Sequence, residues 1–294
     1  MQYGEVFWGI LSTFAAFLLG LMWQRVARLV TNLRARRFWR PLVNREAVVV
    51  VGSFRELPGF EASGVIGLGD NIALNDLERY FAKIGFKRFE VHYNDHFVWA
   101  YGSLRSTLEN NLILLGGPDA NALTRLVLER LALGIEFLEV SPQRLRDGNG
   151  AASDDATEAR TRRRRVPRVR ERSRTWRVPV VLDKETDRLH GPALTTSGIA
   201  SDCGVMIRSP NPFDHRREVI IFCGSYGYGT WAAVRYSQTD EFLKNLPKST
   251  PFLECVFSVD VIRDTPQGIH LEIMRPLPDP VPAGTRNVVP RVID

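Results

Sequence analysis

The sequence predicts an α/β fold, in which a mainly parallel sheet of the Rossmann or flavodoxin type carries helices on both faces and follows a single N-terminal transmembrane helix. Two observations predict it. Three times along the chain an apolar run ends in a glycine-rich turn that leads into a helical pattern, as in open parallel sheets. Ahead of these units, Val6 to Trp23 forms 18 residues without a charge, close to the roughly 20 residues that cross a bilayer.

These patterns divide the 294 residues into six segments. They are a transmembrane anchor over 1–24, a basic juxtamembrane segment over 25–45, a first α/β half over 46–142, a disordered arginine-rich insertion over 143–175, a second α/β half over 176–275 and a proline-rich tail over 276–294. The insertion lacks hydrophobic periodicity and is polar and cationic, which is typical of disorder.

The net charge of +6 combines two strongly basic segments with a remainder of the chain that is acidic. Sixteen of the 39 basic residues are arginines of two short segments, six from Arg25 to Arg40 and ten from Arg160 to Arg177. Outside these segments 32 acidic residues face 23 basic ones, a balance of −9. A broad nucleic-acid surface on the folded body is therefore not expected, because such surfaces are strongly positive.

The order of charge and apolar residues at the N-terminus indicates a retained anchor. A cleavable signal carries its positive charge before the apolar core, whereas here the arginines follow it. This order predicts a single-pass protein of the inner or plasma membrane with its C-terminal domain in the cytoplasm. The segment from Arg25 to Arg40 continues the helical pattern and would lie against anionic lipid. A buried core helix is the alternative.

The first predicted unit runs from a β-branched strand over Ala47 to Val51 into a helix that ends at Gly85. Asp70 is the expected N-cap of that helix. The glycines at 67 and 69 resemble half of a dinucleotide fingerprint, but Ile72 stands where the third glycine is needed. The same glycines also suit a simple turn. A ligand at this turn would meet Gly52, Ser53, Asp70 and Asn71.

The second unit, NLILLGGPDANALTRLVLERL from Asn111 to Leu131, is the clearest of the three. Its strand over Leu112 to Leu115 suits burial on both faces, Gly116 and Gly117 form the turn, and Pro118 fits a first helical turn. The unpaired N–H groups of the following helix would point above the carboxyl end of the strand. That arrangement suits an anionic or polar ligand.

The third unit lies between Asp202 and Tyr236. Strands over Val205 to Arg208 and Val219 to Phe222 flank a turn, and Thr230 opens a helix. The turn before that helix adds further candidate ligand-binding residues, which are Gly224, Ser225, Tyr226, Gly229 and Thr230. Ser225 does not fit the nucleophile of a G-x-S-x-G elbow, because Cys223 replaces the first glycine.

Neither a metal nor a cofactor is indicated by the sequence. The cysteines Cys203, Cys223 and Cys255 form no CxxC pair, which favours a reducing compartment and no zinc site. His92 and His96 would lie about 13 Å apart on one strand face, too far to share an ion. Further strands are expected over Gly134 to Val140 and Trp176 to Leu182, and a hairpin over Phe252 to Met274.

Two strings, NLILLGGPDANALT and DCGVMIRSPNPFDHRREVIIFCGSYGYGTWAAVRY, resemble elements of a poorly characterised group of bacterial Rossmann-like domains. That group combines a strand-GGPxxN-xxT unit, an NPF segment and a GxxGxGTxAA turn. The resemblance covers about a third of the chain, and it carries no assigned activity. It implies a ligand crevice, built from Asp70, Gly116, Gly117, Pro118, Asn121, Thr124, Gly229 and Thr230.

Three functions remain open. The leading hypothesis is a membrane-anchored cytoplasmic sensor or regulatory domain that binds a small nucleotide-like ligand where the three turns converge. The second is a hydrolase or transferase acting on a nucleotide or nucleoside, with Asp70 or Asp202 as base or nucleophile. The third is a structural membrane adaptor whose arginine-rich insertion recruits an acidic partner or lipid. The oligomeric state is not indicated.

Overall fold

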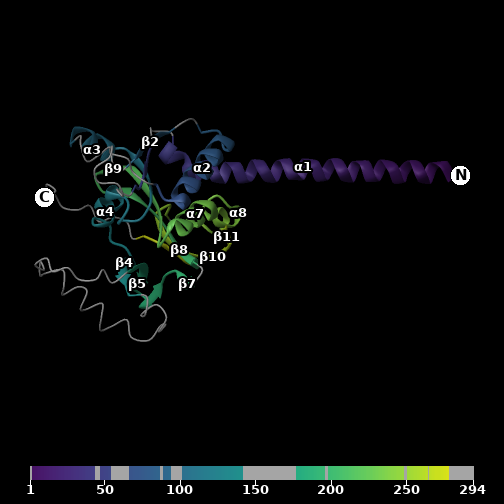
Figure 1. The fold of residues 1–294 in the computed structure, drawn as a ribbon. Helices are drawn as coiled ribbons and strands as arrows, with labels where there is room; N and C mark the ends of the chain where they lie inside the picture. The colour runs from purple at the N-terminus through teal and green to yellow at the C-terminus, as the bar shows by residue number, and fades with distance from the viewer. Residues whose placement is uncertain are drawn as a thin grey trace, which may run out of the picture.

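The computed structural model describes residues 2–43, 47–53, 66–86, 89–93, 101–141, 177–195, 198–247, 250–263 and 265–277. Within them the chain forms an eight-stranded sheet and a separate three-stranded sheet, with helices packed on the larger sheet (Figure 1). The predicted insertion over 143–175 lies outside the described residues, as do nearly all of the predicted tail over 276–294 and His96.

Four neighbouring strands of the larger sheet are parallel, in the order β2-β1-β3-β9. They are β1 (Ala47–Val51), β2 (Glu90–Tyr93), β3 (Asn111–Leu115) and β9 (Asp214–Gly224). Every residue of β1 and β3 is buried, as their continuous apolar character predicted. Along the chain, α2 (Leu68–Lys83) lies between β1 and β2, and α3 (Tyr101–Leu108) precedes β3.

The other half of the larger sheet is antiparallel, so the predicted mainly parallel Rossmann or flavodoxin-like sheet is wrong. β8 (Gly198–Asn211) pairs antiparallel with β9 and with β10 (Leu253–Ile262), β10 with β11 (Thr265–Pro276), and β7 (Ala193–Thr195) with β8. Two residues separate β8 from β9 and two separate β10 from β11, whereas a parallel pair needs a crossover of about a dozen. The fold is mixed α/β, with a mainly antiparallel large sheet.

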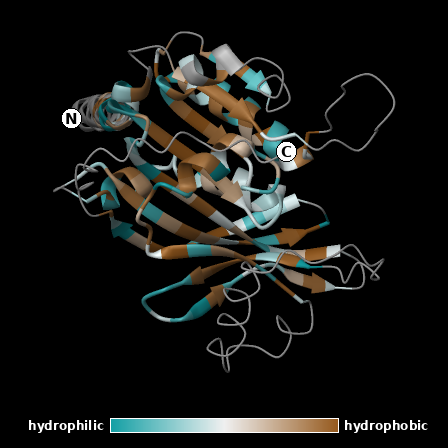
Figure 2. Ribbon diagram, turned by 90° about the vertical axis from the view of Figure 1, so that its left-hand side faces the viewer, coloured by the Kyte–Doolittle hydropathy of each residue, from teal (hydrophilic) through white to brown (hydrophobic). Residues whose placement is uncertain are grey.

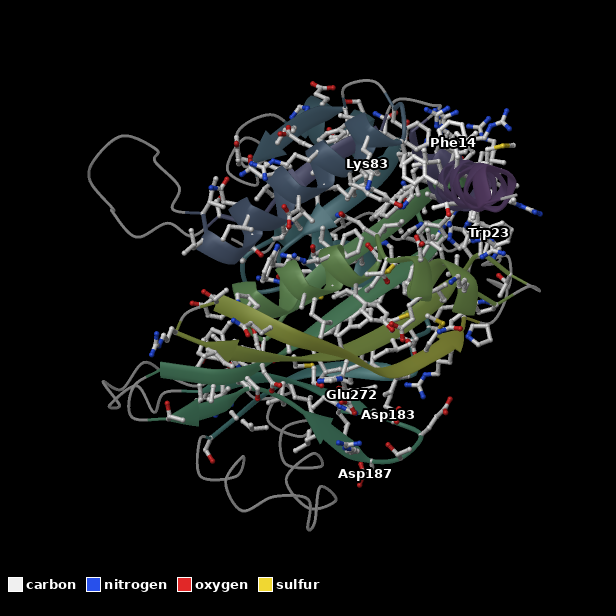
Figure 3. All side chains as sticks on the ribbon, turned by 90° about the vertical axis from the view of Figure 1, so that its right-hand side faces the viewer. Phe14, Trp23, Lys83, Asp183, Asp187 and Glu272 are labelled. Atoms are coloured by element: carbon white, nitrogen blue, oxygen red, sulfur yellow. The ribbon has the colours of Figure 1, made fainter. Side chains whose placement is uncertain are left out.

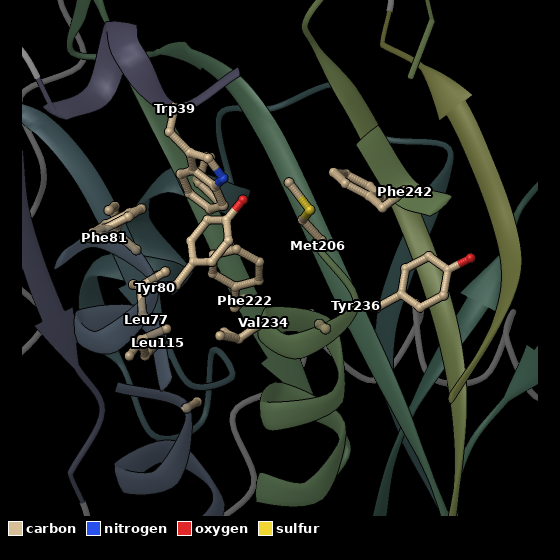
Figure 4. Packing of buried hydrophobic residues seen from close by; sticks show 14 of the residues in the cluster. Trp39, Leu77, Tyr80, Phe81, Leu115, Met206, Phe222, Val234, Tyr236 and Phe242 are labelled. Atoms are coloured by element: carbon tan, nitrogen blue, oxygen red, sulfur yellow. The ribbon is translucent and has the colours of Figure 1, made fainter. Parts of the chain in front are cut away.

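Apolar layers cover both faces of the larger sheet, whose strands are largely hydrophobic (Figure 2). On one face α2, α7 (Gly227–Tyr236), α8 (Asp240–Asn245) and the end of α1 (Gln2–Val43) contribute to one core. Trp39 of α1 lies at its centre among Tyr80, Phe81 and Phe222 (Figure 4). On the other face, α3, α4 (Ala122–Leu128) and the smaller sheet enclose a second core.

α1 is a continuous helix of 42 residues that projects from the body (Figure 1). Its C-terminal end is buried, whereas Phe14 and Trp23 are exposed (Figure 3). The predicted helical continuation through Arg25 to Arg40 is confirmed. Arg36 donates from Nε to the Ile84 carbonyl oxygen at 2.6 Å, which places part of the basic segment against the end of α2. Contact of Arg25 to Arg40 with anionic lipid stays a prediction.

Among the helices that the structure describes, none is both long enough and apolar enough to span a membrane. The predicted transmembrane anchor over 1–24 is therefore wrong, and so is the single-pass location at an inner or plasma membrane that was drawn from it. The uncharged stretch from Val6 to Trp23 has only 18 residues. As a helix it measures about 27 Å, which is shorter than a hydrocarbon core of about 30 Å.

The smaller sheet contains β4 (Ile135–Val140), β5 (Val178–Asp183) and β6 (Arg188–His190), all antiparallel. An arginine of β11 links it to the larger sheet. Arg275 contacts Asp183 from Nη2 at 2.6 Å and Glu185 from Nη1 at 2.9 Å, and its Nε bonds the fully buried Glu254 of β10. Figure 3 labels Asp183 below the yellow strands β10 and β11.

Replacing Arg275 should destabilise the fold strongly. Arg275→Ala leaves the Glu254 and Asp183 carboxylates buried without a cation, so the free energy of unfolding should fall by roughly 2 kcal/mol or more. Urea denaturation measures this change. Arg188→Ala is the matched control, because Arg188 is exposed and reaches Glu272 only at 3.7 Å, so its loss should cost less than about 1 kcal/mol. Equal losses in both variants would refute the buried-pair argument.

Candidate functional site

The three predicted turns meet at one edge of the sheet. β1, β3 and β9 are parallel neighbours, and their hydrogen bonding continues past the strand ends. Gly52 N donates to the Leu115 carbonyl at 2.8 Å, and Gly116 N donates to the Phe222 carbonyl at 2.9 Å. From β1 the chain passes to β2 on one side, and β3 lies on the other. This is the topological switch point, where ligands of open α/β sheets usually bind.

Several glycines at this edge allow backbone segments to approach closely. A Cβ at Gly69 would lie 2.1 Å from the carbonyl carbon of Gly227, because α2 and α7 touch at their N-termini. A Cβ at Gly229 would lie 2.1 Å from the Cys203 carbonyl oxygen. Gly116 additionally has φ of +103°, which disfavours a side chain. Close packing explains Gly69 and Gly229, and backbone conformation explains Gly116.

Asn121 and Thr124, both implied by the family resemblance, hold the turn after β3 together. Asn121 Nδ2 donates to the Val50 carbonyl at 3.1 Å and to the Leu115 carbonyl at 3.0 Å. Its Oδ1 accepts hydrogen bonds from two backbone N–H groups of α4, so Asn121 rather than Pro118 begins this helix. Thr124 Oγ1 donates to the Gly116 carbonyl at 3.1 Å. The polar capacity of Asn121 is fully used within the protein.

Asp202, a predicted base or nucleophile, caps α7 from the neighbouring strand β8. Its carboxylate accepts from the backbone N–H groups of Cys203 at 2.8 Å, Tyr226 at 3.2 Å and Gly229 at 2.6 Å. Burial raises the pKa of Asp202 to about 7, although these three hydrogen bonds oppose the shift, and the charge of Asp70 adds to it. With its oxygens engaged, Asp202 is suited to positioning α7.

Asp70 differs from Asp202 because one of its oxygens is free. It lies in the first turn of α2, where Gly67 is the N-cap, so the predicted capping role of Asp70 is wrong. The residue is 5% exposed, and Oδ1 has no hydrogen-bond partner among the described residues. Burial raises the pKa of Asp70 to about 6, a hydrogen bond with the Thr230 side chain opposes the shift, and the charge of Asp119 adds to it.

Two serine hydroxyls at the same edge also lack partners among the described residues. Ser53 follows β1 and Ser225 follows β9, and each is 7% exposed. Their backbones are fixed, since Ser53 N donates to the Ala120 carbonyl at 3.1 Å and Ser225 N donates to the Cys203 carbonyl at 2.9 Å. Buried polar groups in proteins are nearly always hydrogen-bonded. Three such atoms without partners among the described residues make this edge the candidate site.

The remaining predicted residues lie at the second turn, at the third turn and on α2. Gly117 and Gly224 adjoin, because a Cβ at Gly117 would lie 3.7 Å from the Gly224 carbonyl oxygen. Tyr226 is half-buried, and burial and the charge of Asp202 raise its pKa. Pro118 is half-buried at the turn, whereas Asn71 is exposed on α2.

Asp119 is the residue that the sequence interpretation missed. Its carboxylate lies beside the second turn, where a Cβ at Gly117 would be 2.6 Å from Asp119 Oδ1. Its charge raises the pKa of Asp70 and of the buried Cys223 thiol. The signal was present, because an aspartate directly follows Gly116, Gly117 and Pro118. Within the described chain, no cluster of His, Cys, Asp and Glu suits a metal ion.

Comparisons of the chain with protein-family models, with curated proteins and with solved structures found no match. The resemblance to bacterial Rossmann-like domains therefore stays a prediction. The sheet edge defines the candidate site, above all through the Asp70 oxygen that has no partner among the described residues.

The raised pKa of Asp70 predicts a pH-dependent contribution to stability. The folded state binds this proton more tightly than the unfolded chain, whose carboxyl has the ordinary pKa of 3.8. The contribution is therefore present below about pH 4 and is lost as the pH rises through about 6. Relative to Asp70→Asn, the free energy of unfolding of the wild type should fall by roughly 2 kcal/mol between about pH 4 and pH 7.

Urea denaturation at a series of pH values measures this difference. Glu78→Gln is the control, because Glu78 is exposed on the same helix and its replacement should leave the wild-type profile unchanged. Parallel profiles for the wild type and Asp70→Asn would contradict the raised pKa.

Proposed function

We propose that the protein binds a small nucleotide-like ligand at the carboxyl edge of β1, β3 and β9, in a sensory or regulatory role. One observation carries this proposal. Ser53 Oγ, Asp70 Oδ1 and Ser225 Oγ are buried polar atoms without partners in the described chain, and all three belong to turns or helices that open at this edge. A ligand that hydrogen-bonds to them removes a desolvation cost of about 1–3 kcal/mol for each group.

The chemistry of these atoms matches the sugar and base of a nucleotide. A carboxylate accepts hydrogen bonds from hydroxyl and amino groups, and serine hydroxyls both donate and accept. An acidic side chain at this edge binds ribose hydroxyls in many dinucleotide-binding folds. Asp70 has the corresponding chemistry here, although α2 supplies it.

A binding role accounts for the site better than nucleophilic catalysis. Cys223, the thiol nearest the third turn, is fully buried, and burial holds its pKa far above the ordinary value. A nucleophilic serine needs a base within hydrogen-bond reach, whereas Ser225 Oγ has no partner among the described residues. Asp202 already accepts three backbone hydrogen bonds.

Isothermal titration calorimetry of the full chain with adenosine and with NAD tests this function. Asp70→Asn should raise the dissociation constant about tenfold, because the free acceptor becomes an amide. Affinity should also fall below about pH 6, where Asp70 becomes protonated. Glu78→Gln should bind as the wild type does. Absence of binding by any nucleoside or nucleotide would end the proposal.

A hydrolase or transferase acting on a nucleoside or nucleotide is the second candidate. Its support is that burial raises the pKa of Asp70 to about 6 while one oxygen stays free, and both properties suit a general base. If this function is correct, incubation with adenosine or NAD should release a product detectable by chromatography. Asp70→Asn should then lower kcat at least about a hundredfold without any loss of thermal stability. Turnover retained in that variant would rule out Asp70 as the base.

A further inference from the structure

At two of the three helix N-termini of this edge, a side chain of the protein already occupies the position where a phosphate would bind. Phosphates bind at helix N-termini through free backbone N–H groups. At α4, Asn121 Oδ1 accepts from Leu123 N at 3.1 Å and from Thr124 N at 3.3 Å. At α7, Asp202 accepts from Tyr226 N and Gly229 N. Two of the three helices that open at this edge therefore hold an internal acceptor in the place where an anion would bind.

The third helix carries a negative charge in its own first turn. Gly67 caps α2 without a side-chain hydrogen bond, and Asp70 stands three residues further on. Asp70 Oδ2 also lies over the second turn, because a Cβ at Gly116 would be 3.7 Å from it. An anion near the start of α2 would face this carboxylate, and like charges in a poorly solvated site repel strongly.

Further acidic groups add to the negative charge at this edge. The charge of Asp119 acts on Asp70, and the charge of Asp70 acts on Asp202. Arg125 of α4 lies on the exposed side of the second turn, where its Nε donates to the Pro118 carbonyl at 2.8 Å. The described part of the edge is thus rich in acceptors and negative charge. The atoms still in need of partners are the Asp70 oxygen and the serine hydroxyls.

From this arrangement, and given the proposed function, we infer that the site takes a nucleoside, and that it discriminates against a 5′-phosphate. The hydroxyl groups of the ribose donate hydrogen bonds to Asp70 Oδ1, with Ser53 and Ser225 as further partners. The ligand group at this edge is therefore an uncharged or cationic donor. The sequence predicted an anionic or polar ligand near the helix N-termini, and of these two we infer the polar one.

Calorimetric titration of the full chain with adenosine, AMP and 2′,3′-dideoxyadenosine, without divalent cations, tests the inference. Adenosine should bind at least about tenfold more tightly than AMP, because the phosphate meets the acidic edge. It should also bind at least about tenfold more tightly than the dideoxy compound, which lacks the donors for Asp70. Inorganic phosphate should produce no binding heat.

Asp119→Asn supplies a matched variant. It removes a negative charge beside Asp70 and leaves the Asp70 oxygen in place. The ratio of the affinity for AMP to the affinity for adenosine should be at least about threefold higher in this variant than in the wild type.

The outcomes separate this inference from the proposed function. Binding of AMP as tight as that of adenosine overturns the nucleoside specificity and leaves nucleotide-like binding standing. Equal affinity for adenosine and its dideoxy analogue overturns the role of the ribose hydroxyls. If neither adenosine nor AMP binds, the proposed function and the inference fall together.

Discussion

The buried carboxylate of Asp202 is the contact on which the architecture of the candidate site depends. It joins β8 of the antiparallel half to the first turn of α7, which follows the last parallel strand. The N–H groups at a helix N-terminus need acceptors, and Tyr226 at the N-cap supplies none from its side chain. Asp202 satisfies them internally. The position of Thr230, and through it that of Asp70, follows from this contact.

Close backbone packing and internal capping leave few polar atoms at the sheet edge for a ligand. Gly69, Gly227 and Gly229 are explained by neighbouring backbone, and Asn121 donates to the carbonyl groups of Val50 and Leu115. Among the described residues at this edge, the polar atoms left without a partner are one carboxylate oxygen and two hydroxyls. Such preorganisation of the described side chains favours recognition of a ligand with matching donors.

Local pattern predicted the elements, but it could not predict how distant elements pair. Apolar runs located β1 and β3 because strands buried on both faces need them, and the glycine turns located the sheet edge. The hairpin of β10 and β11 was predicted, but the antiparallel pairing of β8 with β9 was missed although the short NPFD connection already required a hairpin. The roles of Asn121 and Asp202 depend on partners such as Val50 and Tyr226, which lie far away along the chain, so spacing gives no sign of them. The 18-residue uncharged stretch was interpreted as a transmembrane helix although it is slightly shorter than the roughly 20 residues that span a bilayer.

The packing of the C-terminal end of α1 on β9 has a mechanical consequence. Trp39 packs on Phe222, and the Phe222 carbonyl accepts the hydrogen bond that fixes Gly116 at the second turn. From Ala35 outward the helix extends 33 residues, or about 50 Å at 1.5 Å per residue. A rotation of about 10° at the root would therefore sweep its tip through roughly 9 Å. A small tilt of α1 where it packs on β9 would therefore displace its tip by several ångströms.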